Sequence, residues 1–194
     1  EMELFDPSEI HKNKLYNQSE IRGVPNALEP GGLKNVTLYK QQLMDDIIKD
    51  DYLTKLLKYP REDFLSQPSL TQQEREDLIF THVYPTRFIN DIKEERTSLI
   101  SIEFAHWQPF EGYRIFSDKF IFGYIYFYLL SDINIANTNY GVRQDLMLAR
   151  IYDIFEGYSK LGVGEMKQET QLPLYPDNSS YGGYTLGFLL TEYK

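Results

Sequence analysis

Three histidines are the residues in this sequence best suited to acid–base or metal chemistry. They are His11, His82 and His106, and they do not have the short His-x-x-x-His spacing that places two imidazoles on one metal ion. His106 stands beside Trp107 at the end of a predicted strand, a position typical of a structural histidine. We therefore predict no catalytic or metal-binding role for these three side chains.

Motifs for nucleophilic and cofactor chemistry are missing from the sequence. There is no cysteine, which excludes thiol catalysis, thiolate metal ligands and disulfides. No Gly-x-Ser-x-Gly elbow presents a serine nucleophile. Gly162-Val163-Gly164 lacks the third glycine of a dinucleotide-binding loop and follows a predicted helix instead of a strand. We expect no catalytic residue, no metal and no cofactor.

Carboxylates are the remaining candidates for chemistry. Four aspartates lie between the apolar pairs of a predicted helix, where they would hold a divalent ion or, more commonly, form a solvated face: Asp45, Asp46, Asp50 and Asp51. Glu103, on a predicted strand, and Asp118 are a pair that would flank a sugar in a glycosidase. A carboxylate-based hydrolase with a tyrosine-lined cleft therefore stays open, but we favour a protein that is not an enzyme.

The charge balance favours protein partners over nucleic acid or membrane. The net charge is −9, and no basic patch accompanies the aromatic residues, so bulk electrostatics does not bind the chain to phosphates. The longest apolar run, residues 120–130, is much shorter than the roughly 20 residues of a membrane helix. The first residues lack the basic and apolar regions of a signal peptide, so we expect synthesis in the cytoplasm.

Two regions differ in their patterns. Residues 1–36 contain three prolines and a Gly-Gly pair without a persistent period, and they predict an extended arm. Residues 37–194 predict a single domain. Within it we expect a helix over 38–59, a short helix from a Thr71–Glu74 capping box to about 80, and a helix over 141–156 closed by Gly157.

Alternating or continuous apolar residues predict four strands, at residues 97–107, 120–130, 164–174 and 181–193. Gly123 within the second strand predicts a bulge or a close backbone approach. The fold class is therefore α+β, with a four-stranded, mostly antiparallel sheet, two main helices on one face and an extended N-terminal arm. The other face of the sheet stays available for neighbours.

Aromatic residues are the candidates for that contact. The chain has 16 tyrosines and 12 phenylalanines, and tyrosine suits surfaces that are buried against other chains because its ring is apolar and its tip is polar. The strand over 120–130 is apolar or aromatic on both faces, so its second face predicts a subunit contact. The predicted interface residues are Phe5, Tyr16, Phe120, Phe122, Tyr124, Tyr126, Tyr128 and Tyr184.

The order of the predicted elements resembles that of the tail terminator, or tail completion, proteins of long-tailed bacteriophages. The resemblance extends to the predicted second helix and the turn after it, in the stretches Gly141-Val142-Arg143-Gln144-Asp145-Leu146, Ile154-Phe155-Glu156-Gly157 and Gly162-Val163-Gly164-Glu165-Met166. The resemblance covers residues 37–194. It implies a hexameric ring in the virion that caps the tail tube and joins the tail to the head.

The partners that this resemblance implies are further copies of the chain, the tail tube protein and a head-completion or connector protein, with genomic DNA passing through the lumen without specific binding. The arm and an insertion over residues 60–96 depart from the compact form of that group. They leave open another head-to-tail connector, such as a head-completion or stopper protein. A small acidic binding module or inhibitor is a further alternative.

Overall fold

The computed structural model describes residues 35–87, 96–109, 119–176 and 180–193, and they form an α+β fold, as predicted. The helices are α2 (Val36–Lys49), α3 (Asp51–Lys58), α4 (Gln72–Glu76) and α6 (Arg143–Phe155), with 3-10 turns η2 (Phe64–Ser66) and η3 (Ile133–Ile135). The strands are β1 (Val83–Tyr84), β2 (Ser98–Pro109), β3 (Phe120–Asp132), β4 (Asn137–Thr138), β5 (Gly141–Val142), β6 (Lys167–Leu174) and β7 (Tyr181–Tyr193).

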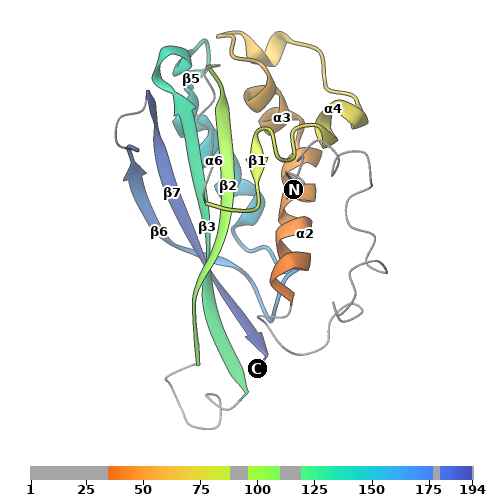
Figure 1. Cartoon of the computed structure of the whole chain (residues 1–194), viewed down its shortest axis with the longest axis vertical. Coiled ribbons are helices and arrows are strands. Elements are labelled where there is room, and N and C mark those ends of the chain that lie inside the picture. Colours follow the sequence, from red (N-terminus) through yellow and green to blue (C-terminus); the bar gives the residue numbers. More distant parts are fainter. Residues whose placement is uncertain (1–34, 88–95, 110–118, 177–179, 194) are drawn as a thin grey trace, which may run out of the picture.

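Five of these strands form one mixed sheet, in the order β1-β2-β3-β7-β6 (Figure 1). The four predicted strands pair antiparallel. The fifth, β1, pairs parallel with β2 through Val83 and Tyr84, so the prediction of four strands is wrong in this detail. A strand of two residues is too short to show alternation, which is why the sequence pattern did not reveal it.

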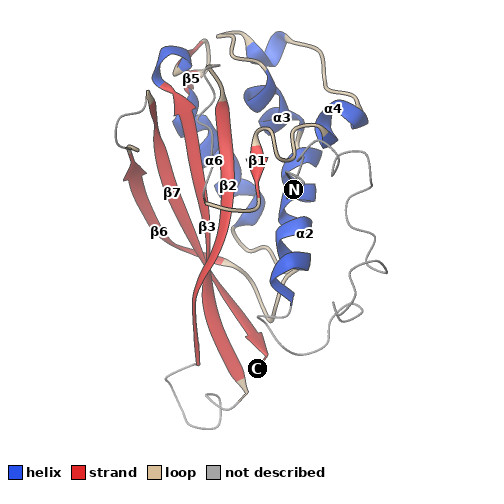
Figure 2. Ribbon diagram, viewed as in Figure 1, coloured by secondary structure: helices blue, strands red, loops and turns tan. Residues whose placement is uncertain are grey.

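The helices α2, α3 and α6 pack on one face of the sheet (Figure 2). Strand residues on that face alternate with residues of the opposite face. The core between the layers consists of apolar side chains from both, among them Leu43, Ile47, Leu53, Ile102, Ile125, Phe127, Met147, Ile151, Phe155, Leu186 and Phe188. The sheet is therefore covered by helices on one side, and its other face carries the surface described below.

The helix predicted over residues 38–59 is divided at Asp50. This residue has an extended backbone, and its side chain accepts a hydrogen bond of 2.8 Å from the N–H of Leu53. An aspartate in this position satisfies a free backbone donor and favours a helix N-terminus, so α3 begins anew after it. The apolar i, i+4 spacing continues across the break, and periodicity alone therefore predicted one helix.

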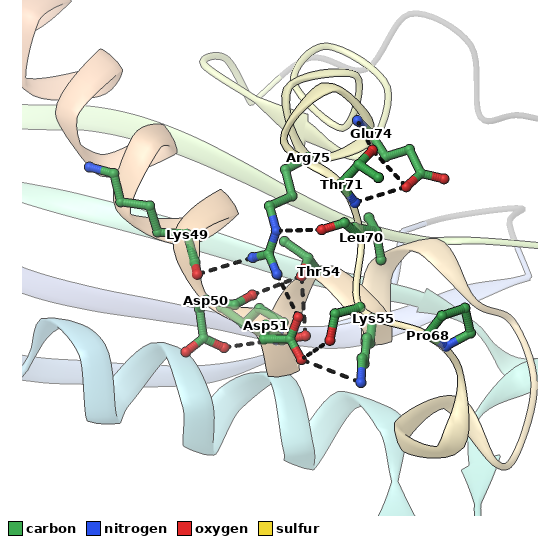
Figure 3. A network of polar contacts seen from close by, with 12 residues as sticks. Lys49, Asp50, Asp51, Thr54, Lys55, Pro68, Leu70, Thr71, Glu74 and Arg75 are labelled. Carbon is green, nitrogen blue, oxygen red and sulfur yellow. Dashed lines mark hydrogen bonds and ion pairs between the residues drawn. The ribbon is translucent and has the colours of Figure 1, made fainter.

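Arg75 of α4 closes the C-terminal end of α2 at this break (Figure 3). Its guanidinium donates to the carbonyl oxygens of Ile48 and Lys49, each at 3.0 Å, and to the carboxylate of Asp51. Lys55 adds a second cation, with its Nζ 3.3 Å from Asp51. These contacts satisfy carbonyls that a helix end leaves unpaired, and they hold α4 against the break.

Arg143, the first residue of α6, performs the same task for α3 from inside the core. It is fully buried, and it donates to the carbonyl oxygens of Leu56 at 2.7 Å, Tyr59 at 3.1 Å, Arg61 at 2.8 Å and Ile135 at 3.0 Å. Burial lowers the pKa of its guanidinium to about 10. Its charge lies at the negative end of the α3 dipole, which favours a cation there.

Two local predictions are confirmed, and the close approach predicted at Gly123 is found with a side chain instead of backbone. The capping box joins Thr71 and Glu74 at the start of α4. Gly157 follows α6 with a φ of +73°, which suits a helix-terminating glycine. Gly123 marks a close approach, because a Cβ there would stand 2.7 Å from Cδ2 of Trp107.

Candidate interaction surface

The face of the sheet away from the helices carries a row of tyrosines on β3. Ile125, Phe127 and Leu129 pack in the core, so the residues between and beside them, at 124, 126 and 128, point to the other face. The backbone register places them between β2 and β7. We name this surface the tyrosine face and define it by Glu103, His106, Tyr124, Tyr126, Tyr128 and Glu169.

The rings of the tyrosine face are ordered against one another. The centroids of Tyr124 and Tyr126 are 5.8 Å apart with the rings 18° from parallel, and those of Tyr126 and Tyr128 are 6.4 Å apart. The ring of His106 stands edge-on to Tyr124 and Tyr126, at 6.3 and 6.1 Å. Such offset and edge-on contacts each contribute about 1 kcal/mol beyond apolar burial.

A bulge in β2 positions His106 in this group. The β2–β3 register shifts between Ala105 and Gln108, and His106 lies inside the shift with a φ of +57°. A bulge redirects the side chain of its extra residue. A left-handed backbone at a non-glycine residue is uncommon and is maintained by surrounding contacts, here including the two tyrosine rings.

Gly187 of β7 makes room for the central ring. It lies opposite Tyr126 in the β3–β7 register, and a Cβ on it would stand 2.8 Å from Cε1 of that ring. Real Cβ atoms do not approach so closely. The ring of Tyr126 therefore lies over a position where only glycine leaves enough space for the ring.

The tyrosine hydroxyls at both ends of the row donate to carboxylates. Tyr128 donates to Glu103 of β2, and Tyr124 donates to Glu169 of β6 at 2.8 Å. Burial and the bond to Glu103 raise the pKa of Tyr128, and the bond to Glu169 raises the pKa of Tyr124. The phenols therefore stay neutral at ordinary pH, which suits recognition and does not suit a nucleophile.

Arg87 places a cation at the end of the tyrosine face near β1. The guanidinium carbon of Arg87 lies 5.2 Å from the ring centroid of Tyr128, within the range of a cation–π contact. Tyr128 is only 8% exposed, whereas Tyr124 and Tyr126 are half-buried. The accessible part of the face therefore lies around the stacked rings of Tyr124 and Tyr126.

The predicted interface residues separate into three groups. Phe120 and Phe122 share the face of Tyr124 by strand alternation, and both are half-buried. Tyr184 lies on the helix face, where its hydroxyl donates to Asp145 of α6 at 2.8 Å. Phe5 and Tyr16 lie outside the described residues.

Three of the candidate carboxylates, Asp46, Asp50 and Asp51, are engaged in holding the fold. Asp46 accepts hydrogen bonds from Tyr158 and from Lys160 at 2.9 Å, and Asp50 accepts from Arg150 at 3.0 Å. Asp45 is half-buried, and burial raises its pKa. Asp118 lies outside the described residues, so its pairing with Glu103 stays untested. Within the described part of the chain, no group of three acidic or histidine side chains is placed to hold a metal ion.

Sequence reasoning missed four residues that shape the tyrosine face. Glu169, Arg87 and Gly187 contact β3 from positions distant in the chain, and no local pattern marks them. His106 was recognised as structural, but its contact with the tyrosines depends on a bulge that alternation does not predict. Three glycines in strand 181–193 with a tyrosine-rich strand nearby were the available signal for close packing.

Comparison with known proteins gives the family of the chain. The model of the YomW family matches residues 50–190, a span that includes β2, β3, α6, β6 and most of β7. No curated protein matches the sequence. No helix in the described residues is both long and apolar enough to cross a membrane. The chain belongs to the YomW family, a phage-derived family.

Proposed function

We propose that this chain is a structural protein of the phage particle that works by assembling with further copies and has no catalytic role. The observation that carries the proposal is the tyrosine face. Its rings are already ordered in the single chain, so burying them against a neighbour loses little side-chain entropy. Tyrosine is also enriched in the buried centres of protein interfaces.

The proposed assembly is a ring of six copies at the phage neck, which ends the tail tube and joins the tail to the head. The phage origin of the family supports this proposal, as does the element order of α3, β2, β3, α6, β6 and β7, which resembles tail terminator proteins. A ring forms when one surface of each copy binds a different surface of the next and the rotation closes.

The charge of the chain fits a position on the path of the genome. A net charge of −9 repels phosphates, so DNA could slide through a lumen of such subunits without binding. The neighbours in the virion would be the tail tube protein and a head-completion protein. A head-completion or stopper protein of the same neck would also need a contact surface of this kind.

The native mass of the purified chain, measured by light scattering behind a sizing column, tests the proposal. Six copies of 22.9 kDa weigh about 137 kDa, the value expected for a closed ring. A mass of about 23 kDa at every concentration would overturn the ring and favour an acidic binding module that acts as a single copy. A ring of the expected mass that binds purified tail tubes would support the terminator role over a head-side connector.

A further inference from the structure

β6 forms an edge of the sheet within the described chain. It pairs with β7 on one side, and no described strand covers its other side. The backbone N–H and C=O groups of that side can pair with an added strand. Pro173 has no N–H, so such pairing is confined to residues 167–172.

A groove runs beside this edge, between β6 and α6, with a volume of about 340 Å³. Leu148, Ala149 and Leu186 give it an apolar floor, and Asp145 and Asp153 give it acidic walls. Among the described residues that line the groove there is no lysine or arginine. The groove therefore suits side chains with an apolar stem and a positive tip, which describes lysine.

Large apolar side chains are exposed on both sides of β6. Tyr152 borders the groove and is 43% exposed, Leu172 on the other face of β6 is 56% exposed, and Tyr175 just beyond β6 is 75% exposed. A strand added to β6 would cover apolar surface on both faces of the sheet. An edge with this much exposed apolar surface is typical of a binding site.

We infer that residues 10–16 of a second copy add as a strand to the free edge of β6, with Lys12 and Lys14 in the groove. This inference rests on the proposed assembly and names the contact between neighbouring copies. The segment reads Ile-His-Lys-Asn-Lys-Leu-Tyr. In a strand, side chains two apart share a face, so Ile10, Lys12, Lys14 and Tyr16 would point to the groove together.

Charge supports this occupant. The segment holds two lysines and no acidic residue, and it would meet Asp145 and Asp153. Arg150 binds Asp50 at 3.0 Å and also forms an ion pair with Asp153 at 3.7 Å, but the side chain of Asp153 is 62% exposed and stays accessible to a second cation. Exposed ion pairs contribute little to affinity, so backbone pairing and apolar burial supply most of it.

The length of the chain before α2 allows contact with a neighbour. Eighteen residues lie between Tyr16 and Asn35, and at about 3.3 Å per residue they can span up to about 60 Å. That reach exceeds the width of a small domain, so the segment can reach a second copy.

Thiol crosslinking between two singly substituted full-length chains tests the contact, because the native chain has no cysteine. One chain carries Asn13→Cys, and the other carries Leu172→Cys together with a size tag. Position 13 points away from the groove, as Leu172 does, so both thiols share one face. A short thiol-specific crosslinker should join the two chains into a heterodimer on a denaturing gel. Lys58→Cys, exposed at the end of α3, replaces Leu172→Cys in the matched control.

The expected result is a heterodimer yield at least fivefold above that of the Lys58→Cys control, and a severalfold loss when Asp153→Lys is added to the Leu172→Cys chain. Equal yields from the two positions would overturn the inference. If the native mass shows a ring while the crosslinking yields are equal, the proposed assembly is supported and the contact between residues 10–16 and β6 is contradicted. A monomeric chain that also gives equal crosslinking yields would contradict both the proposed assembly and this contact.

Discussion

Gly187 lies directly opposite Tyr126 in the β3–β7 pair, and a Cβ on residue 187 would stand 2.8 Å from the tyrosine ring. This relationship makes the position of the central ring depend on one missing methyl group. Elsewhere in a strand, alanine is preferred to glycine because it restricts the unfolded chain. Here the methyl group has no space unless the ring moves.

Gly187→Ala should therefore destabilise the fold by about 1–3 kcal/mol, the usual cost of overpacking. Urea unfolding followed by the fluorescence of Trp107, the single tryptophan, measures the change. Combining Gly187→Ala with Tyr126→Ala should remove most of the added cost, because the clashing ring is gone. Equal effects of Gly187→Ala in both backgrounds would mean that the ring is not what glycine accommodates.

Arg143→Met should destabilise the fold by about 3–5 kcal/mol. The substitution keeps much of the buried volume but leaves up to four carbonyl oxygens without their donor. Arg143→Lys should also be costly, since one ammonium cannot reproduce the fork of donors. Arg61→Met, at an exposed side chain, serves as the control and should change the free energy of unfolding by less than about 0.5 kcal/mol. A similarly small effect at both positions would contradict the structural role of Arg143.

The parts of the fold that the sequence predicted are those with local causes. The capping box of α4 needs only Thr71 and Glu74, three residues apart. The strand over 181–193 shows alternation from Tyr184 to Leu190. The helix break at Asp50 has no such local pattern. The apolar spacing is the same on either side of Asp50, and only its hydrogen bond to Leu53 reveals that α3 begins there.

The tyrosine face was predictable in its composition but not in its contacts. Alternation within one strand places Tyr124, Tyr126 and Tyr128 together. Their partners depend on sheet register: Glu169 reaches Tyr124 from 45 residues away, and Gly187 meets Tyr126 through pairing with β7. Register is set by how strands pack in three dimensions, and a bulge at Ala105–Gln108 alters it without a local sequence signal.

Asp46 predicts a pH dependence of stability. Burial alone would raise the pKa of this carboxyl, but hydrogen bonds from Tyr158, Lys160 and Lys49 lower it to about 2 in the folded chain. An unfolded aspartate has a pKa of 3.8. The folded pKa is the lower one, so the ionised form stabilises the fold above pH 4, and this contribution is lost as the pH falls from about 4 to about 2.

Asp46→Asn should therefore lower the free energy of unfolding by about 1–2 kcal/mol at pH 7. The difference between the native chain and the variant should shrink as the pH falls toward 2. Urea unfolding at a series of pH values measures it, with Asp63→Asn, at a half-buried aspartate outside this network, as the control. A difference that stays constant between pH 7 and pH 2.5 would show that ionisation of Asp46 does not carry the effect.

Removing the accessible rings of the tyrosine face should abolish assembly while the fold persists. Tyr124→Ser with Tyr126→Ser takes away two half-buried rings on the side of the sheet away from the helices, so the loss of stability should be modest and the loss of interface large. Light scattering should report the mass of a single chain in place of the mass of the proposed ring, and circular dichroism should keep the native spectrum. Tyr140→Ser, at a ring that is 44% exposed on the loop between β4 and β5, should leave the mass unchanged. A double variant that still assembles at native concentrations would move the subunit contact away from this face.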